Sequence, residues 1–197
     1  KELSAQIFAD TIISNIPGGK DKTQPIYRDG PLSLLKALLL RVATDEHNLF
    51  PNGKNIKSAY DILQNEDVDY MDKLFNKDIM SENEKISLGP YQSFKTASPN
   101  LRGNIITNLS TSLNLLQTKA VADVLSTDDI DLTLPGRQPC AYFCQFPDSH
   151  DTYKFIMSLF FSMLFMALTN YADSRQDNDG RLPVPVNFML DEFPSIG

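Results

Sequence analysis

The stretch that decides the fold reads Val184-Pro185-Val186-Asn187-Phe188-Met189-Leu190-Asp191-Glu192-Phe193. It is apolar up to two adjacent carboxylates, which predicts a strand over residues 186–190. A second short, aromatic run lies between two prolines and predicts a strand over residues 141–146. The apolar residues between the two runs predict a helix over residues 152–171. A strand, a helix and a strand within about fifty residues form a βαβ unit, whose strands are expected to be parallel with a right-handed crossover.

Helices are predicted in the part of the chain before these strands. Apolar residues recur every three or four positions over residues 3–16. Pro31 is expected in the first turn of the next helix, which is apolar on most sides and should therefore be packed on several faces. Short segments between polar breaks then predict a cluster of short helices, including residues 56–63 and 68–75, with one break at Gly89-Pro90.

One long helix is predicted after this cluster. Ser98 is a suitable N-cap, Pro99 follows it, and apolar residues recur every three or four positions as far as Val124. The helix is expected to end near residues 126–129. The fold class is therefore α/β towards the end of the chain and all-α in the middle.

Composition excludes several classes of protein. The hydrophobic fraction is 42% and the charged fraction 22%, values typical of globular chains, so a disordered chain and a coiled-coil rod are excluded. The 18 Lys and Arg against 25 Asp and Glu give a net charge of -7. Proteins held to nucleic acid by bulk charge are normally basic, so any DNA contact must be local.

The longest apolar stretch, residues 155–168, is shorter than the roughly 20 residues that span a bilayer, which predicts a buried helix. No signal peptide is visible at the start of the chain, and the missing initiator Met suggests part of a larger protein. Cys140 and Cys144 are separated by about 13 Å along a strand, beyond the reach of a disulfide. Both are predicted to be free, buried thiols in a reducing compartment, the cytoplasm.

The two carboxylates at the end of the predicted strand have the form of a Walker B segment. Strands of a parallel sheet present their carboxyl ends at the edge where nucleotide phosphates lie. There Asp191 would bind Mg²⁺, directly or through water, and Glu192 would orient or deprotonate the attacking water. The alternative is a strand that ends in a solvated acidic turn, and the pattern alone favours neither.

Other catalytic motifs are weaker. Gly18-Gly19-Lys20 is predicted to be a loop, because a P-loop requires Gly where the chain has Ser14 and Ser or Thr where it has Asp21. His47 and His150 lie in no metal-ligand spacing and are expected to be ordinary polar residues.

Basic residues near aromatic ones are candidate contacts for substrate or DNA. Two such patches are predicted, with Lys54 and Lys57 in the first and Lys95 and Arg102 in the second. Residues 44–118 carry seven Lys and Arg against ten acids, however, so a solvated helical surface is the alternative. The same balance favours protein contacts over direct DNA contacts, because phosphate binding needs clustered cations.

The chain resembles the VirD4/TraG family, the type IV secretion coupling proteins of bacterial conjugation. The strongest similarity is the run from Leu182 to Phe193 followed by Ile196-Gly197. Further similarity lies in Tyr91-Gln92-Ser93-Phe94 before a long helix, in Asp129-Ile130-Asp131-Leu132 and in the run from Ala141 to Tyr153. The resemblance covers most of the chain after about Phe94.

This resemblance implies a membrane-tethered, hexameric, RecA-like ATPase that uses ATP and Mg²⁺ and passes DNA with its attached relaxase to a secretion channel. It implies that Asp191 coordinates Mg²⁺ and that Glu192 is catalytic. The implied organisation is a partial RecA-like nucleotide-binding domain, residues 1–43 and 119–197, interrupted by an all-α domain, residues 44–118. That inserted domain would engage relaxase and relaxosome proteins at the cytoplasmic face of the membrane.

Two features depart from the family pattern. Pro194-Ser195 stands where Ala-Asn is common, and the implied Walker A loop and membrane helices would precede Lys1. The chain is therefore expected to be a soluble internal fragment that does not hydrolyse ATP alone. The alternatives are a non-catalytic helical module that binds a substrate or partner, and another RecA-like DNA-translocating ATPase.

Overall fold

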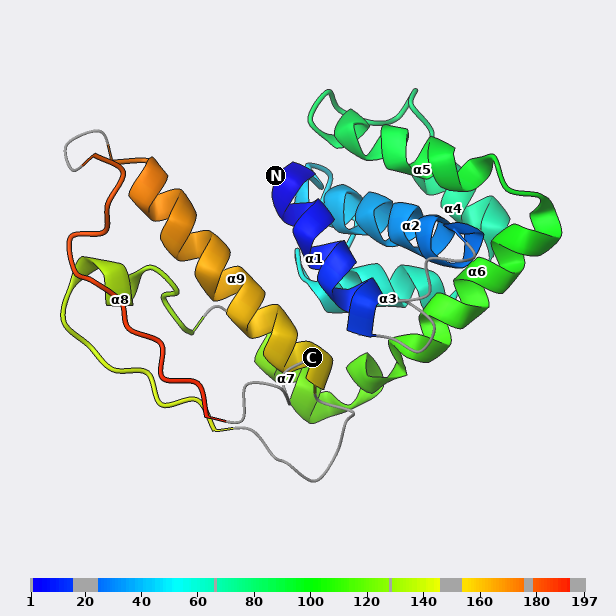
Figure 1. Ribbon diagram of the computed structural model, residues 1–197. Coiled ribbons are helices and arrows are strands. Elements are labelled where there is room, and N and C mark those ends of the chain that lie inside the picture. The colour runs from blue at the N-terminus through cyan, green and yellow to red at the C-terminus, as the bar shows by residue number, and fades with distance from the viewer. Residues whose placement is uncertain are drawn as a thin grey trace. The chain divides into compact units, whose positions relative to one another are not determined.

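The computed structural model describes residues 2–15, 25–65, 67–127, 129–145, 154–175 and 179–191. The chain divides into two compact units, Lys1–Thr127 and Asp128–Gly197, called here the helical unit and the second unit. All regular secondary structure among the described residues is helical (Figure 1). The assignment of residues 1–43, 44–118 and 119–197 to separate domains stays a prediction.

The helical unit is built around one apolar helix, α2 (Pro25–Ala43). Its other elements are α1 (Glu2–Asn15), α3 (Ile56–Gln64), α4 (Val68–Leu74), η1 (Glu84–Ser87), α5 (Leu88–Lys95), α6 (Pro99–Ser112), η2 (Asn114–Gln117) and α7 (Lys119–Ser126). Figure 1 shows α2 lying among these helices, and it packs against α1, α3, α5, α6 and η1. Six of its apolar side chains are almost fully buried: Leu34, Leu35, Ala37, Leu38, Leu40 and Val42. The expectation that this helix is packed on several faces is confirmed.

Local signals account for the short helices α3 and α4. The Asn55 side chain accepts a hydrogen bond from the backbone N–H of Ser58 at 3.1 Å and so caps α3. Asp67 caps α4 in the same way, by accepting from the N–H of Asp69 at 2.8 Å. The predicted helices at residues 3–16, 56–63 and 68–75 are confirmed to within two residues.

Pro31 is expected to start a helix and Pro90 to interrupt the chain between helices, but both lie within helices. Pro31 lies inside α2, which begins at Pro25, so Pro25 occupies the first-turn position that tolerates a missing N–H. Gly89 and Pro90 lie in the first turn of α5 and do not break it. In α2 the helix already begins upstream, at Pro25. In α5 the 3₁₀ helix η1 leads directly into the first turn.

The predicted long helix from Ser98 to Val124 is wrong in its middle. Leu113–Thr118 leaves the α-helical path, and the i→i−3 hydrogen bonds Leu116 N–Leu113 O and Thr118 N–Leu115 O form a 3₁₀ turn. Side chains three residues apart eclipse one another in such a turn, so Leu113 and Leu116 both enter the core, at 1% and 0% exposure. Burial of two leucines thus outweighs continuation of the helix.

The second unit contains α8 (Leu134–Arg137), α9 (Lys154–Asp173) and an extended segment, residues 181–191. A hydrogen bond from Val184 N to Gly136 O at 3.1 Å holds this segment beside α8. Gly136 permits that approach, because a Cβ there would lie 2.7 Å from Leu182 Cδ2. The rings of Phe165 and Phe188, 4.6 Å apart, join the segment to α9.

No strand occurs at residues 141–145 or 186–190, where the sequence predicts the two strands of a βαβ unit. Residue 146 and residues 148–151, with the predicted start of the intervening helix, lie outside the described part of the chain. A strand requires a hydrogen-bonded neighbour, and the extended segment 181–191 makes one such backbone bond among the described residues, to a helix. The structure supports a mostly helical fragment, and the RecA-like α/β class stays a prediction.

Two further expectations for the second unit are corrected. Cys140 and Cys144 are free, as predicted, but both are exposed because no sheet covers them in the described part of the chain. The apolar stretch is only partly buried: Leu159, Leu164 and Leu168 are buried, Phe165 is 43% exposed, and the other described residues of the stretch are half-buried. By length and composition alone, Ile156–Asp173 could cross a membrane, a test that core helices of soluble proteins also pass.

Candidate functional site

Asp191 is an exposed residue in a turn at the end of the extended segment. The preceding Phe188 is anchored on Phe165 of α9, so the position of the carboxylate depends on that aromatic contact. Exposed carboxylate oxygens are the donors that Mg²⁺ prefers, so Asp191 fits the predicted metal ligand chemically. Glu192, the predicted catalytic residue, lies outside the described residues, as do Gly18-Gly19-Lys20 and His150. The roles of Asp191 and Glu192 stay predictions.

A buried ion pair lies at the centre of the helical unit. Arg41 of α2 is 1% exposed, Glu84 of η1 is 0% exposed, and Arg41 Nη1 lies 2.9 Å from Glu84 Oε1. The same carboxylate accepts hydrogen bonds from the backbone N–H groups of Glu46 and Ser81 and lies 3.1 Å from His47 Nδ1. The pair therefore ties α2 to two loops that are far apart in the sequence.

The electrostatics of Glu84 follow from these partners. Burial alone would raise the pKa of Glu84, but the two backbone N–H groups, His47 and the Arg41 charge together lower it to about 2. The carboxylate is thus ionised at neutral pH in spite of its burial. An ionised and fully hydrogen-bonded buried group of this kind is expected to serve the fold, by fixing which loops meet α2.

Asp45, His47 and Glu84 have potential metal-binding atoms within 4.8 Å of one another. Arg41 Nη1 lies 2.9 Å from Glu84 and 3.8 Å from Asp45, so a guanidinium already occupies the cationic position between the two carboxylates. A divalent cation would have to displace it. This arrangement indicates a structural cluster, and the half-exposed His47 is consistent with the polar role expected for it.

A second polar cluster surrounds Asp72 of α4. Its Oδ1 accepts a hydrogen bond from the Tyr91 hydroxyl at 2.7 Å and lies 3.0 Å from Arg102 Nη2 and 3.2 Å from Lys95 Nζ. Burial would raise the pKa of Asp72, but these hydrogen bonds and cations hold it below its usual value. Burial and the bond to Asp72 raise the pKa of Tyr91, which stays a neutral donor. Tyr91 also stacks on Phe75, with ring centroids 4.0 Å apart.

A pocket of about 640 Å³ adjoins this cluster, between α4 and α5. Its charged lining residues are Asp69, Asp72, Lys73, Lys77 and Lys95. Lys73 and Lys77 are exposed, and neither forms an ion pair with another described residue. Uncompensated cations around a hollow are able to bind an anionic group.

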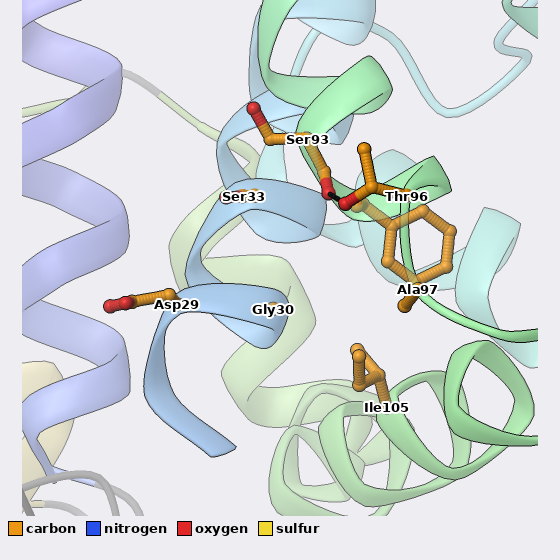
Figure 2. A pocket seen from close by; sticks show the side chains of 8 residues that line it. Asp29, Gly30, Ser33, Ser93, Thr96, Ala97 and Ile105 are labelled. Atoms are coloured by element: carbon orange, nitrogen blue, oxygen red, sulfur yellow. Dashed lines mark hydrogen bonds between the residues drawn. The ribbon is translucent and has the colours of Figure 1, made fainter. Parts of the chain in front are cut away.

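A smaller pocket of about 410 Å³ lies where α2, α5 and α6 meet (Figure 2). Figure 2 shows Ile105 beneath Gly30, where a Cβ would be 2.6 Å from Ile105 Cδ1. The Thr96 hydroxyl donates to Ser93 O at 2.7 Å, and the Ser93 hydroxyl donates to Gly89 O at 3.3 Å. Asp29 is the one ionisable residue among the described residues that line it. These hydroxyls are engaged by their own backbone, so this pocket offers little binding chemistry.

The four cations predicted to contact substrate or DNA have different environments. Lys57 pairs with Asp61 at 2.6 Å, and Lys95 and Arg102 both pair with Asp72. Arg102 is only 8% exposed and lies over the Phe94 ring, 5.3 Å from its centroid. Lys54 is exposed and forms no ion pair within the described part of the chain. Three of the four cations thus form ion pairs with two internal acids, and the role of the four in binding DNA stays a prediction.

Sequence reasoning did not single out Lys73 and Lys77. A weak signal was present, because the two residues are four apart, with Lys73 in the last turn of α4 and Lys77 in the turn that follows it. Their significance depends on α5, which supplies the opposite side of the pocket and is separated from α4 by the loop before η1. The spacing alone therefore could not distinguish them from other surface lysines.

Comparison with known proteins relates the chain to one described family. The profile of the family described as "Type IV secretory system Conjugative DNA transfer" matches residues 2–197. No curated protein and no solved structure matches the chain. The family match extends through the helical unit as well as the Asp191 segment.

Proposed function

Because the chain belongs to the type IV secretory system conjugative DNA transfer family, we propose that it is part of a coupling ATPase that recruits DNA with its relaxase and drives their transfer to the secretion channel. The observation that carries this proposal is the family match over residues 2–197. In this function the intact protein works as a hexamer at the cytoplasmic face of the cell membrane. Relaxase, relaxosome proteins and channel proteins are its proposed partners.

The chemistry proposed for the second unit is ATP hydrolysis. Asp191 coordinates the Mg²⁺ of bound ATP, and Glu192 orients or deprotonates the attacking water. The contact of Phe188 with Phe165 supports this proposal, because it holds the segment that carries Asp191 against a long helix. A Walker A loop is not recognisable among residues 1–197, so the chain alone is proposed to be inactive.

The helical unit is proposed to select the substrate. The acids of its interior polar clusters, Glu84 and Asp72, are paired with cations of the unit, whereas the pocket between α4 and α5 presents lysines without ion pairs among the described residues. This surface also favours the second candidate function, a helical module that binds a partner without catalysis.

Conjugation with a Glu192→Gln variant tests the proposed activity. Donor cells whose gene carries this change are expected to transfer plasmid at least about 100-fold less often, because the loss of a general base typically costs 10² or more in rate. Asp173→Asn, an exposed acid-to-amide change at the end of α9, is the matched control and is expected to transfer within about twofold of wild type. Undiminished transfer by Glu192→Gln would favour the non-catalytic module.

A further inference from the structure

The pocket between α4 and α5 combines free cations with an apolar wall. Lys73 and Lys77 are exposed and lack ion pairs within the described residues, whereas Lys57 and Lys85 are paired with acids on their own helix or turn. Lys95 also lines the pocket, and it already shares Asp72 with Arg102. The pocket lining and Arg102 together carry four cations against the two acids Asp69 and Asp72, so the net charge of the region is positive. Lys73 and Lys77 are the cations that lack an ion pair among the described residues.

The aromatic residues at this pocket do not suit nucleic acid. Proteins that bind single strands usually stack bases on exposed aromatic rings. Phe75 is 5% exposed, Tyr91 is 1% exposed, and the two rings stack on each other, so neither offers a free face. Asp69 also lies beside the lysines and would repel a continuous row of phosphates. Discrete carboxylates on a peptide are able to reach Lys73 and Lys77 while avoiding Asp69.

The remaining lining residues suit a peptide. Leu88, which is half-buried, provides apolar contact, and the amide side chains of Asn76 and Gln92 are able to hydrogen-bond a peptide backbone. A volume of about 640 Å³ accommodates a few side chains. The ligand that complements all three features has acidic residues on both sides of an apolar one.

We propose that the pocket between α4 and α5 binds an acidic peptide segment that contains an apolar residue, presented by a protein destined for transfer. Lys73 and Lys77 contact its carboxylates, and Leu88 contacts its apolar side chain. The origin of the peptide in a transferred protein rests on the proposed function, whereas the binding of the peptide does not.

Fluorescence anisotropy with the 197-residue chain tests this proposal. The probe is a fluorescein-labelled peptide with the sequence Glu-Glu-Leu-Glu-Glu, and the comparison peptide has Gln in place of each Glu. The double variant Lys73→Gln/Lys77→Gln is expected to raise the Kd of the acidic peptide about tenfold, as two exposed ion pairs would. The matched control is Lys85→Gln/Lys119→Gln, which removes two lysines outside the pocket and is expected to change the Kd less than twofold.

The proposal is overturned if the acidic peptide does not bind at low salt, if it binds no better than the Gln peptide, or if both double variants weaken it equally. It is also overturned if an oligothymidine of twenty nucleotides depends on Lys73 and Lys77 while the peptide does not, which would make the pocket a phosphate site. The Glu192→Gln conjugation experiment does not depend on peptide binding. Failure of the proposed function and failure of the proposed peptide site can therefore be told apart.

Discussion

Glu84 has four partners that stabilise its ionised form in a fully buried position. Its folded-state pKa of about 2 lies below its ordinary value of 4.5. A depressed pKa contributes stability that is fully present above pH 4.5 and is lost as the pH falls towards 2. This single carboxylate thus makes the helical unit sensitive to acid.

Glu84→Gln is expected to lower the free energy of unfolding at pH 7 by about 3 kcal/mol, because it leaves the buried Arg41 without its closest counter-charge. Urea unfolding at pH 7 and pH 3 measures the effect, and the difference between variant and wild type should shrink at pH 3. Glu82→Gln is a suitable control, since Glu82 is exposed and, among the described residues, forms its ion pair with Lys85. A Glu84→Gln penalty that does not vary with pH would contradict the assigned pKa.

Among the elements, α3 and η2 are joined through one hydroxyl. Tyr60 of α3 is 1% exposed, and its oxygen accepts hydrogen bonds from Gln64 Nε2 and Gln117 Nε2, both at 2.8 Å. Gln117 lies in the break between α6 and α7, so this bond ties the break to α3. It therefore helps to fix the 3₁₀ turn at Asn114–Gln117, together with the buried Leu113 and Leu116.

Tyr60→Phe is expected to destabilise the chain by about 1 kcal/mol, the usual net contribution of hydrogen bonds to a buried group. Thermal or urea unfolding followed by circular dichroism measures this change. Tyr70→Phe removes the same hydroxyl from a 40% exposed side chain and should have almost no effect. Equal destabilisation by the two variants would show that the Tyr60 bonds do not hold η2 in place.

In the whole molecule, apolar burial is divided unequally between the two units. The buried hydrophobic residues described for the second unit are Leu159, Leu164 and Leu168, whereas all the others lie in the helical unit. Regions with few buried apolar contacts open more easily. The second unit, which carries Asp191, is therefore expected to be the less stable part of the isolated chain.

Hydrogen exchange followed by mass spectrometry checks this expectation. Amides of α9 in the isolated 197-residue chain should exchange at least about tenfold faster than amides of α2, because α2 is packed on several sides. Peptides from α1 and α3 provide internal references within the helical unit. Equal protection of α9 and α2 would show that the second unit has a core as stable as that of the helical unit.

The residue pattern predicted several elements well because local signals specify them. Periodic apolar residues placed α1 and α9, and short segments between polar breaks placed α3 and α4, which the structure shows capped by Asn55 and Asp67. Local signals were misleading where packing overrode them, as at Pro31 inside α2 and at the turn that interrupts the helix after Ser112. The predicted strands depended on neighbours that the sequence pattern could not supply.

The candidate site divides in the same way. The sequence by itself identified the Asp191-Glu192 carboxylates and the family resemblance, because both lie in a contiguous motif. Only the tertiary structure decided that Arg41 meets Glu84, 43 residues away, and that α5 encloses the pocket beside Lys73 and Lys77. The physical reason is that a motif or a cap acts within a few residues, whereas charge pairing and pocket formation depend on which helices pack together.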